Sequence, residues 1–244
     1  MKAIILAAGY RKGLNTFQKD LSSALLPVRG RPAIEFLLEK IQILPFVEEI
    51  FIVINERCFL PFQAWLDDYV HHVPIRLISN GSCGQKDNCG AAGDLALVIK
   101  KEHIDDDVIV AGADNIFSFS LTDFIHDAFR KKPFPLIAVY HGDAKPKLKR
   151  YGMVKVDEAQ RVIDFCEKPP RRNGLNLISA CLYFLPKEKL STLEQYLAIN
   201  TNGCAIGDYI KWLSQNDAVF AFEGKGDWFD IGDDDSYTEA IFRF

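Results

Sequence analysis

Runs of apolar residues alternate with amphipathic segments along most of the chain. A nearly continuous apolar run at 2–8 is typical of a parallel strand that is covered on both faces. Similar runs predict strands at 50–54, 75–79, 108–111, 136–140, 178–185 and 218–222. Helical spacing of apolar residues predicts helices after Pro32, at 59–70, 92–101, 121–131 and 208–214, and at the end of the chain. Strands that alternate with helices favour an α/β protein with a mostly parallel sheet.

A hairpin interrupts this alternation in the second half of the chain. Short strands are predicted at 152–156 and 161–165, on either side of the turn Asp157-Glu158-Ala159-Gln160. No internal repeat, low-complexity tract or linker is evident, so we expect a single domain over residues 1–244. The expected architecture is a Rossmann-like three-layer sandwich, with a mostly parallel mixed sheet and this β-hairpin inserted into it.

Composition and charge narrow the classes of function. The formal net charge of −4 argues against nucleic acid as a partner. No apolar run approaches the roughly 18 residues of a membrane span. No pattern of a secretory signal is evident, so we expect a cytoplasmic protein without a membrane partner. The six cysteines form no C-x-x-C pair, which favours reduced thiols over disulfides or a zinc site.

The loops that follow the predicted strands carry the candidate chemistry, because ligands of such sheets bind at the carboxyl ends of strands. The first loop, A-A-G-Y-R-K-G-L at 7–14, matches neither G-x-G-x-x-G nor G-x-x-x-x-G-K-[ST]. A glycine after a first strand nevertheless allows the backbone to approach a phosphate closely. This loop is therefore a candidate phosphate site.

Two acidic residues also follow predicted strands. Asp114 lies just beyond the strand at 108–111, and Asp230 lies between Phe229 and Ile231. An acidic residue between two large apolar residues is rarely a fully exposed surface residue without a specific role. Two carboxylates from separate strand ends make a minimal magnesium site for nucleotide chemistry. An Asx turn that closes the strand is the alternative for Asp114.

Five segments, in order along nearly the whole chain, resemble the sugar-1-phosphate nucleotidyltransferases, also called NDP-sugar pyrophosphorylases. The D-N-I-F stretch at 114–117 and the overall length are most similar to those of glucose-1-phosphate thymidylyltransferases. The segments are K-A-I-I-L-A-A-G at 2–9, A-L-L-P-V-R-G-R-P-A-I-E-F at 24–36, A-G-A-D-N-I-F at 111–117, Y-G-M-V-K-V-D with F-C-E-K-P at 151–157 and 165–169, and W-F-D-I-G-D-D-D-S-Y-T-E-A at 228–240.

This resemblance implies a reaction between a nucleoside triphosphate and a sugar-1-phosphate, with an NDP-sugar and pyrophosphate as products. It also implies roles for individual residues. Mg²⁺ would be held by Asp114 and Asp230. The nucleotide would contact Ala7, Ala8, Gly9, Gly90 and Asp114, and Gln85 would read a thymine or uracil edge, with Asn80 as the alternative. The hairpin would be the sugar-binding element, and the sugar phosphate would contact Tyr151, Gly152, Glu167 and Lys168. Asp114 and Lys168 would also serve catalysis.

The first two segments depart from the family pattern at positions that matter for the triphosphate. Aligned without gaps, Gly13 stands where the family has an arginine, and Ser23 stands where it has a lysine. One well-aimed charge of this kind is worth roughly 2.7–4 kcal/mol in a transition state. Arg11, Lys12 and Lys19 are close enough in the sequence to serve instead, and we expect Arg11 and Lys12 to be the catalytic cations.

A third departure concerns the acceptor, because Cys181 replaces a family glycine and would narrow the sugar pocket. The departures leave alternatives open. The chain is either a nucleotidyltransferase or a catalytically impaired protein that binds a nucleotide or an NDP-sugar and acts in regulation. Phosphocholine or another alcohol phosphate is a further candidate acceptor. The base, the sugar and the oligomeric state, a homo-oligomer included, are not determined by the sequence.

Overall fold

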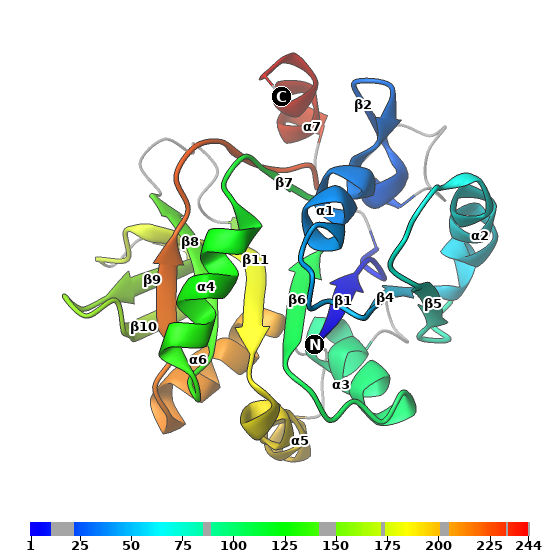
Figure 1. The fold of residues 1–244 in the computed structure, drawn as a ribbon. Helices are drawn as coiled ribbons and strands as arrows, with labels where there is room; N and C mark the ends of the chain where they lie inside the picture. Colours follow the sequence, from blue (N-terminus) through cyan, green and yellow to red (C-terminus); the bar gives the residue numbers. More distant parts are fainter. Residues whose placement is uncertain are drawn as a thin grey trace.

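A mixed sheet lies at the centre of the computed structural model, which describes residues 1–10, 22–84, 89–141, 150–171, 174–200, 205–232 and 234–243. Its strands follow the spatial order β12–β8–β11–β6–β1–β4–β5 (Figure 1). Only β11 runs against its neighbours β6 and β8 in this order. The strands are β1 (Lys2–Leu6), β4 (Glu49–Ile54), β5 (Ile75–Ser79), β6 (Val108–Gly112), β8 (Leu136–His141), β11 (Leu177–Leu185) and β12 (Phe220–Glu223).

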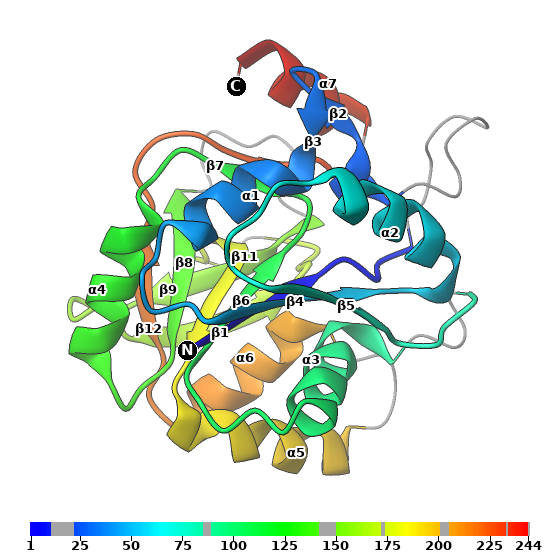
Figure 2. The ribbon, with the colours of Figure 1, turned by 45° about the vertical axis from the view of Figure 1, so that its right-hand side comes forward.

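Helices cover both faces of this sheet, which confirms the predicted three-layer architecture (Figure 2). One face packs against α1 (Ala33–Gln42), α2 (Phe59–Asp68) and α4 (Leu121–Lys131). The other face packs against α3 (Gly90–Lys101), α5 (Leu190–Ile199) and α6 (Ile206–Asn216). The alternation of β1 shows how the sequence divides the core, because Ala3 and Ile5 enter the first layer and Ile4 enters the second.

Smaller elements extend the sheet around its carboxyl edge. The predicted hairpin is present as β9 (Gly152–Val156) and β10 (Val162–Glu167), and β9 pairs with the first part of β11. A two-stranded ribbon joins β7 (Asn115–Phe117) to β13 (Trp228–Asp230), and another joins β2 (Pro27–Val28) to β3 (Arg31–Pro32). The last helix is α7 (Asp234–Arg243), which packs with α1, β7 and β13 in a small third cluster.

The differences from the predicted elements are local. β1 ends at Leu6, although the backbone of Ala7 still donates to Val53 at 2.8 Å. The strand near the end of the chain begins at Phe220, and α5 is a helix that the pattern did not predict. Its buried residues Leu190, Leu193 and Tyr196 cover the sheet beside α3 and α6.

The cysteines that the structure describes, Cys58, Cys83, Cys89, Cys166 and Cys181, are free thiols, as predicted for these positions. Cys204 lies outside the described residues. Among the helices of the described segments, none has both the length and the apolar character needed to cross a membrane.

Candidate functional site

The two acidic residues singled out in the sequence converge at the carboxyl edge of the sheet. The ribbon β7–β13 brings them together, because its register places Asp230 opposite Asn115, the residue after Asp114. The backbone of Ile231 also donates to the carbonyl of Asp114 at 2.9 Å. A Cβ built on Gly232 would lie 2.8 Å from Asp230 Oδ1 and 3.7 Å from Asp114 Oδ2. Both carboxylates therefore face the same point in space.

The neighbours of Asp114 hold its carboxylate in place. Asn115 Nδ2 donates to Asp114 Oδ1 at 3.2 Å, and the buried Asn115 side chain accepts from Trp228 Nε1 at 2.8 Å. Ser23 Oγ donates to Asp114 Oδ2 at 3.5 Å. Ser23 thus contacts Asp114 with a neutral hydroxyl.

The donor set at this point fits a divalent cation that is shared with a bound phosphate. Asp114 and Asp230 are both half-buried, and they offer the hard oxygen ligands that Mg²⁺ prefers. In the described segments, no group of three or more His, Cys, Asp and Glu residues forms a complete metal cage. Mg²⁺ in nucleotide enzymes commonly uses one or two carboxylates and completes its shell with phosphate oxygens and water. The pair can therefore hold a metal that arrives with its phosphate.

Tyr151 and Arg150 border the carboxylate pair from the hairpin side. The Tyr151 ring is buried, and it packs edge-to-face against Trp228 with ring centroids 5.1 Å apart. Burial, with a further contribution from the negative charge of Asp230, raises the pKa of Tyr151 to about 12. The Cβ position of Gly232 lies 3.7 Å from a guanidinium nitrogen of Arg150. Arg150 is thus a cation beside Asp230.

Glu167 occupies a slot between two glycines. A Cβ on Gly152 would lie 3.1 Å from Glu167 Oε2, and a Cβ on Gly207 would lie only 2.1 Å from the same oxygen. Gly207 is in the first turn of α6, so the carboxylate abuts the amino end of that helix. Burial raises the pKa of Glu167, against the opposing effect of Lys168, whose Nζ is 3.6 Å from Glu167 Oε1.

Lys168 remains largely exposed, with 62% of its side chain accessible. Its backbone has a φ of +46° and donates to the carbonyl of Tyr151 at 3.1 Å. The predicted acceptor residues Tyr151, Gly152, Glu167 and Lys168 therefore lie together, at the end of the hairpin. Gly207 had no signal in the sequence, because its role depends on the packing of α6 against β10.

Cys181 lies between the acceptor residues and the carboxylate pair. Its φ of +50° falls in the left-handed region that favours glycine, at the point where the register of β11 against β8 shifts. A Cβ on Gly112 would lie 3.0 Å from Cys181 Sγ. The residue keeps some exposed surface, yet burial of the thiol raises its pKa to about 12, and the charges of Asp114 and Asp230 act in the same direction.

The predicted nucleotide end lies where β1 and α3 meet the same edge. Ala7 and Ala8 are buried, and the backbone of Ala113 donates to the carbonyl of Leu6 at 3.0 Å, which links this end to the carboxylates. A Cβ on Gly9 would meet no atom of the described residues within 4 Å. Gly90 begins α3 with a φ of +78°.

Several predicted residues cannot be placed at this end. Those outside the described residues are Arg11, Lys12, Gly13, Lys19 and Gln85. Asn80, the alternative to Gln85, accepts from the backbone and hydroxyl of Ser82 at 2.9 and 2.7 Å, and donates to Asp94 at 2.7 Å. The Asn80 side-chain oxygen already accepts two bonds, so reading a base edge through this oxygen would require one of them to break.

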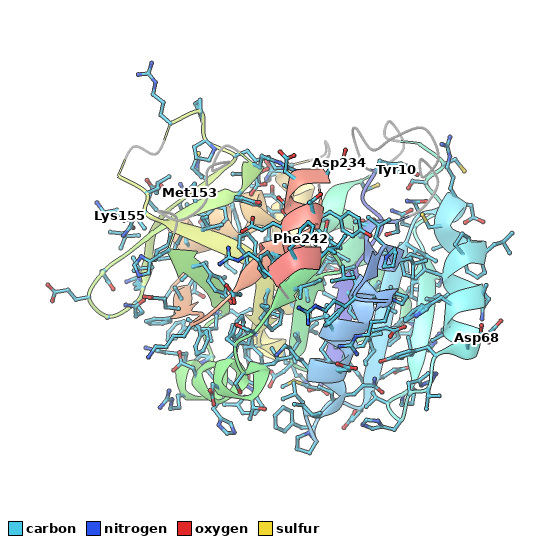
Figure 3. All side chains as sticks on the ribbon, turned by 90° about the horizontal axis from the view of Figure 1, so that it is seen from above. Tyr10, Asp68, Met153, Lys155, Asp234 and Phe242 are labelled. Atoms are coloured by element: carbon cyan, nitrogen blue, oxygen red, sulfur yellow. The ribbon has the colours of Figure 1, made fainter. Side chains whose placement is uncertain are left out.

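The two ends of the site are separated across the molecule. In the view from above, Tyr10 at the nucleotide end and Met153 of the hairpin lie on opposite sides of α7 (Figure 3). Asp234, which starts α7, follows shortly after Asp230 in the sequence. The predicted nucleotide residues, the carboxylate pair and the predicted acceptor residues therefore all lie at the carboxyl edge of the sheet.

Comparison with known proteins gives a consistent result. A family model described as nucleotidyl transferase matches residues 2–243. The "Bifunctional protein GlmU" of Methanocaldococcus jannaschii is 25% identical over 232 residues, covering 95% of this chain and 51% of that protein. A bifunctional sugar-1-phosphate nucleotidylyltransferase/acetyltransferase of Sulfurisphaera tokodaii is also 25% identical over 232 residues, covering 95% of this chain and 52% of that protein. This chain spans about half the length of these relatives.

The fold comparison agrees with the sequence comparison. A UDP-glucose pyrophosphorylase solved in complex with UDP-glucose superposes with a TM-score of 0.82. The match covers 99% of this chain and 97% of that one, at 17% identity. At that identity the likeness shows a shared fold.

Proposed function

The chain belongs to the nucleotidyl transferase family, and we propose that it joins a nucleoside triphosphate to a sugar-1-phosphate to give an NDP-sugar and pyrophosphate. The convergence of Asp114 and Asp230 through the β7–β13 register carries this proposal. Glu167, the predicted sugar ligand, lies near this pair, since its charge acts on the Cys181 thiol together with the charges of Asp114 and Asp230. The relatives whose names include sugar-1-phosphate nucleotidylyltransferase support the same substrate class.

The proposed chemistry is a single in-line displacement. A phosphate oxygen of the sugar-1-phosphate forms a bond to the α-phosphorus of the triphosphate. The bond from that phosphorus to the bridging oxygen breaks, and its electron pair leaves with pyrophosphate. The attacking oxygen is already anionic, so the protein needs no general base and contributes alignment and charge stabilisation.

In this proposal different residues at the carboxyl edge of the sheet stabilise charge, contact the base and bind the sugar phosphate. Mg²⁺ held by Asp114, Asp230 and the phosphates would offset the negative charge of the transferring group. Arg150 lies beside Asp230, where its guanidinium can face a phosphate oxygen. Arg11 and Lys12 remain the predicted cations of the first loop, and Gln85 and Gly90 the predicted neighbours of the base. Glu167 would bind sugar hydroxyls, and Lys168 the sugar phosphate.

Pyrophosphate release tests the proposal directly. The protein is incubated with Mg²⁺ and each pairing of the common NTPs with a panel of sugar-1-phosphates. We expect release with at least one pairing, and a loss of at least about 10²-fold in Asp230→Asn. Asp227→Asn is the matched control, because Asp227 is an exposed carboxylate of the same segment, paired with Arg243 at 3.8 Å. Absence of pyrophosphate release from every pairing contradicts the proposal.

A binding protein without turnover is the second candidate. The observation in its favour is the neutral contact of Ser23 with Asp114, where the family has a lysine. Calorimetry with NTPs and NDP-sugars separates the two candidates. Tight binding without pyrophosphate release supports the binding protein. Turnover that is lost in Arg11→Ala or Lys12→Ala rules it out, because the first loop then still performs chemistry.

A further inference from the structure

A chain of hydrogen bonds connects the first loop to a buried carboxylate in α3. Tyr10 Oη donates to the carbonyl of Ser82 at 2.8 Å and lies 3.1 Å from Ser82 Oγ. Ser82 N and Oγ both donate to Asn80 Oδ1, at 2.9 and 2.7 Å. Asn80 Nδ2 donates to Asp94 Oδ1 at 2.7 Å. Tyr10, Ser82, Asn80 and Asp94 are separated in sequence but form one continuous chain.

The protons of this chain run in one direction. The hydroxyl proton of Ser82 is given to Asn80, so the contact between Tyr10 and Ser82 Oγ can only share the single proton that Tyr10 donates to the Ser82 carbonyl. Asn80 must turn its amino group to Asp94, because a carboxylate only accepts. From Ser82 to Asp94 every donor therefore points toward the carboxylate, and a charged end acceptor strengthens these bonds by polarising them.

Asp94 is an unusual residue for its position. It is only 5% exposed and sits on the face of α3 that contributes Leu95 and Val98 to the core. Burial raises the pKa of Asp94. The hydrogen bond from Asn80 is the interaction that opposes the effect of burial on Asp94. An apolar residue would pack here without the cost of burying a carboxylate.

Ser82 is the point where three loops of the carboxyl edge meet. Its carbonyl accepts from Tyr10 in the loop after β1 and from the backbone of Glu56 at 3.0 Å, in the segment after β4. Ser82 itself belongs to the loop after β5, and it is 2% exposed. The backbone of Asn80 also donates to Ile54 at 2.9 Å. The chain from Asp94 thus sets the position of Tyr10 relative to the sheet.

We propose that Asp94, through Asn80 and Ser82, is a positioning device that holds Tyr10, and with it the described start of the first loop, at the edge where an NTP would bind. Tyr10 is the residue at which this device holds the loop, and in the sequence it directly precedes Arg11 and Lys12. The inference rests on the proposed function, since it needs an NTP at this edge. Tyr10, Ser82, Asn80 and Asp94 act through the loop and not on the reacting atoms.

The test combines binding and kinetics in Tyr10→Phe, Asp94→Leu and the double variant. NTP affinity is measured by calorimetry without acceptor, and the KM values of NTP and acceptor are measured separately. We expect each single variant to weaken NTP binding about three- to tenfold, the value of one hydrogen bond. The acceptor KM should stay within about twofold. The double variant should bind NTP as weakly as the single variant with the lower affinity, because the two substitutions interrupt the same chain of hydrogen bonds.

Control variants keep the result interpretable. Tyr69→Phe removes a hydroxyl that accepts from Gln42 at 3.0 Å, outside the chain, and should leave NTP binding unchanged. Asp94→Asn retains an oxygen for Asn80, so it should fall between wild type and Asp94→Leu and provides a folded variant if Asp94→Leu does not fold.

Three outcomes would overturn the inference: single-variant effects that multiply in the double variant, an equal rise in both KM values, or unchanged NTP binding. Unchanged NTP binding in a protein that still releases pyrophosphate contradicts the positioning role alone. A wild type that binds no NTP contradicts both this inference and the proposed function. NTP binding that weakens as expected in a protein without turnover supports the positioning role and contradicts the proposed enzyme.

Discussion

Gly207 offers the sharpest test of how the acceptor pocket is built. An alanine at this position would place its Cβ 2.1 Å from Glu167 Oε2 and 2.9 Å from the Phe165 ring. Ordinary contact begins at 3.4 Å, so the carboxylate must retreat by about 1.3 Å. A displacement of roughly 1 Å in a positioning group can lower a rate by about 10²-fold, or about 2.7 kcal/mol. We expect kcat/KM for the acceptor to fall by that order.

The folded state should tolerate this change. Alanine is favoured over glycine in a helix by roughly 0.5–1 kcal/mol, whereas the crowding of Glu167 and Phe165 costs about 1–3 kcal/mol. The net loss of roughly 0–2.5 kcal/mol leaves a folded protein for kinetic measurement. Steady-state kinetics with either substrate varied should show a large change for the acceptor and a change within about twofold in the KM of the NTP.

A double-variant cycle identifies the cause. Once Glu167→Ala has removed the carboxylate, adding Gly207→Ala should lower activity little further. Independent effects of the two changes, or a Gly207→Ala protein whose acceptor kcat/KM stays within about threefold of wild type, would refute the idea that the glycine seats Glu167. An equal loss for both substrates would point to a general disturbance of α6.

The remaining predictions concern Glu167 and Cys181. Burial raises the folded pKa of Glu167, so its contribution to stability is present below the unfolded pKa and lost as pH rises through the folded value. Urea melts should therefore show Glu167→Gln more stable than wild type near pH 7 and no more stable at about pH 3. Cys181→Gly should gain about 1 kcal/mol in the same assay, because it relieves the φ of +50°, and should admit bulkier acceptors. A variant that loses stability, or whose acceptor range is unchanged, contradicts that reasoning. Iodoacetamide at about pH 7.5 should label the exposed Cys83 and Cys89 and spare Cys181, whose pKa is about 12, as read by mass spectrometry; early labelling of Cys181 would contradict its burial.

Much of the fold follows from local patterns. The helix predicted at 121–131 is α4, because its apolar residues recur at helical spacing on one buried face. The strand predicted at 75–79 is β5, because its apolar residues match a strand that is buried in the sheet. The acidic run near the end of the chain begins α7, with Asp234 and Asp235 in its first turn. The predicted hairpin also forms, although β10 extends to Glu167 and thereby carries that side chain into the pocket.

Other features have no local signal. β7 and β13 are three residues each, too short for a periodicity to show, and they form because each finds the other across the chain. Asn80 looks like a free loop amide in the sequence, whereas its bonds to Ser82 and Asp94 depend on where α3 lies. Arg150 looks like one more charge in a basic stretch until the ribbon brings Gly232 beside it.

The sequence by itself determined most of the longer elements, the mixed α/β layering and the chemical types of the candidate residues: a glycine-bearing first loop, Asp114 and Asp230, and the pair Glu167 and Lys168. Tertiary structure alone decided which of these groups meet. Hydrophobic periodicity indicates which side of each helix or strand is buried, but it carries no information on the distances between segments. The register of β7 against β13 brings the carboxylates together, and the approach of α6 to β10 makes a glycine necessary at 207. Those distances follow from packing the whole chain around one sheet.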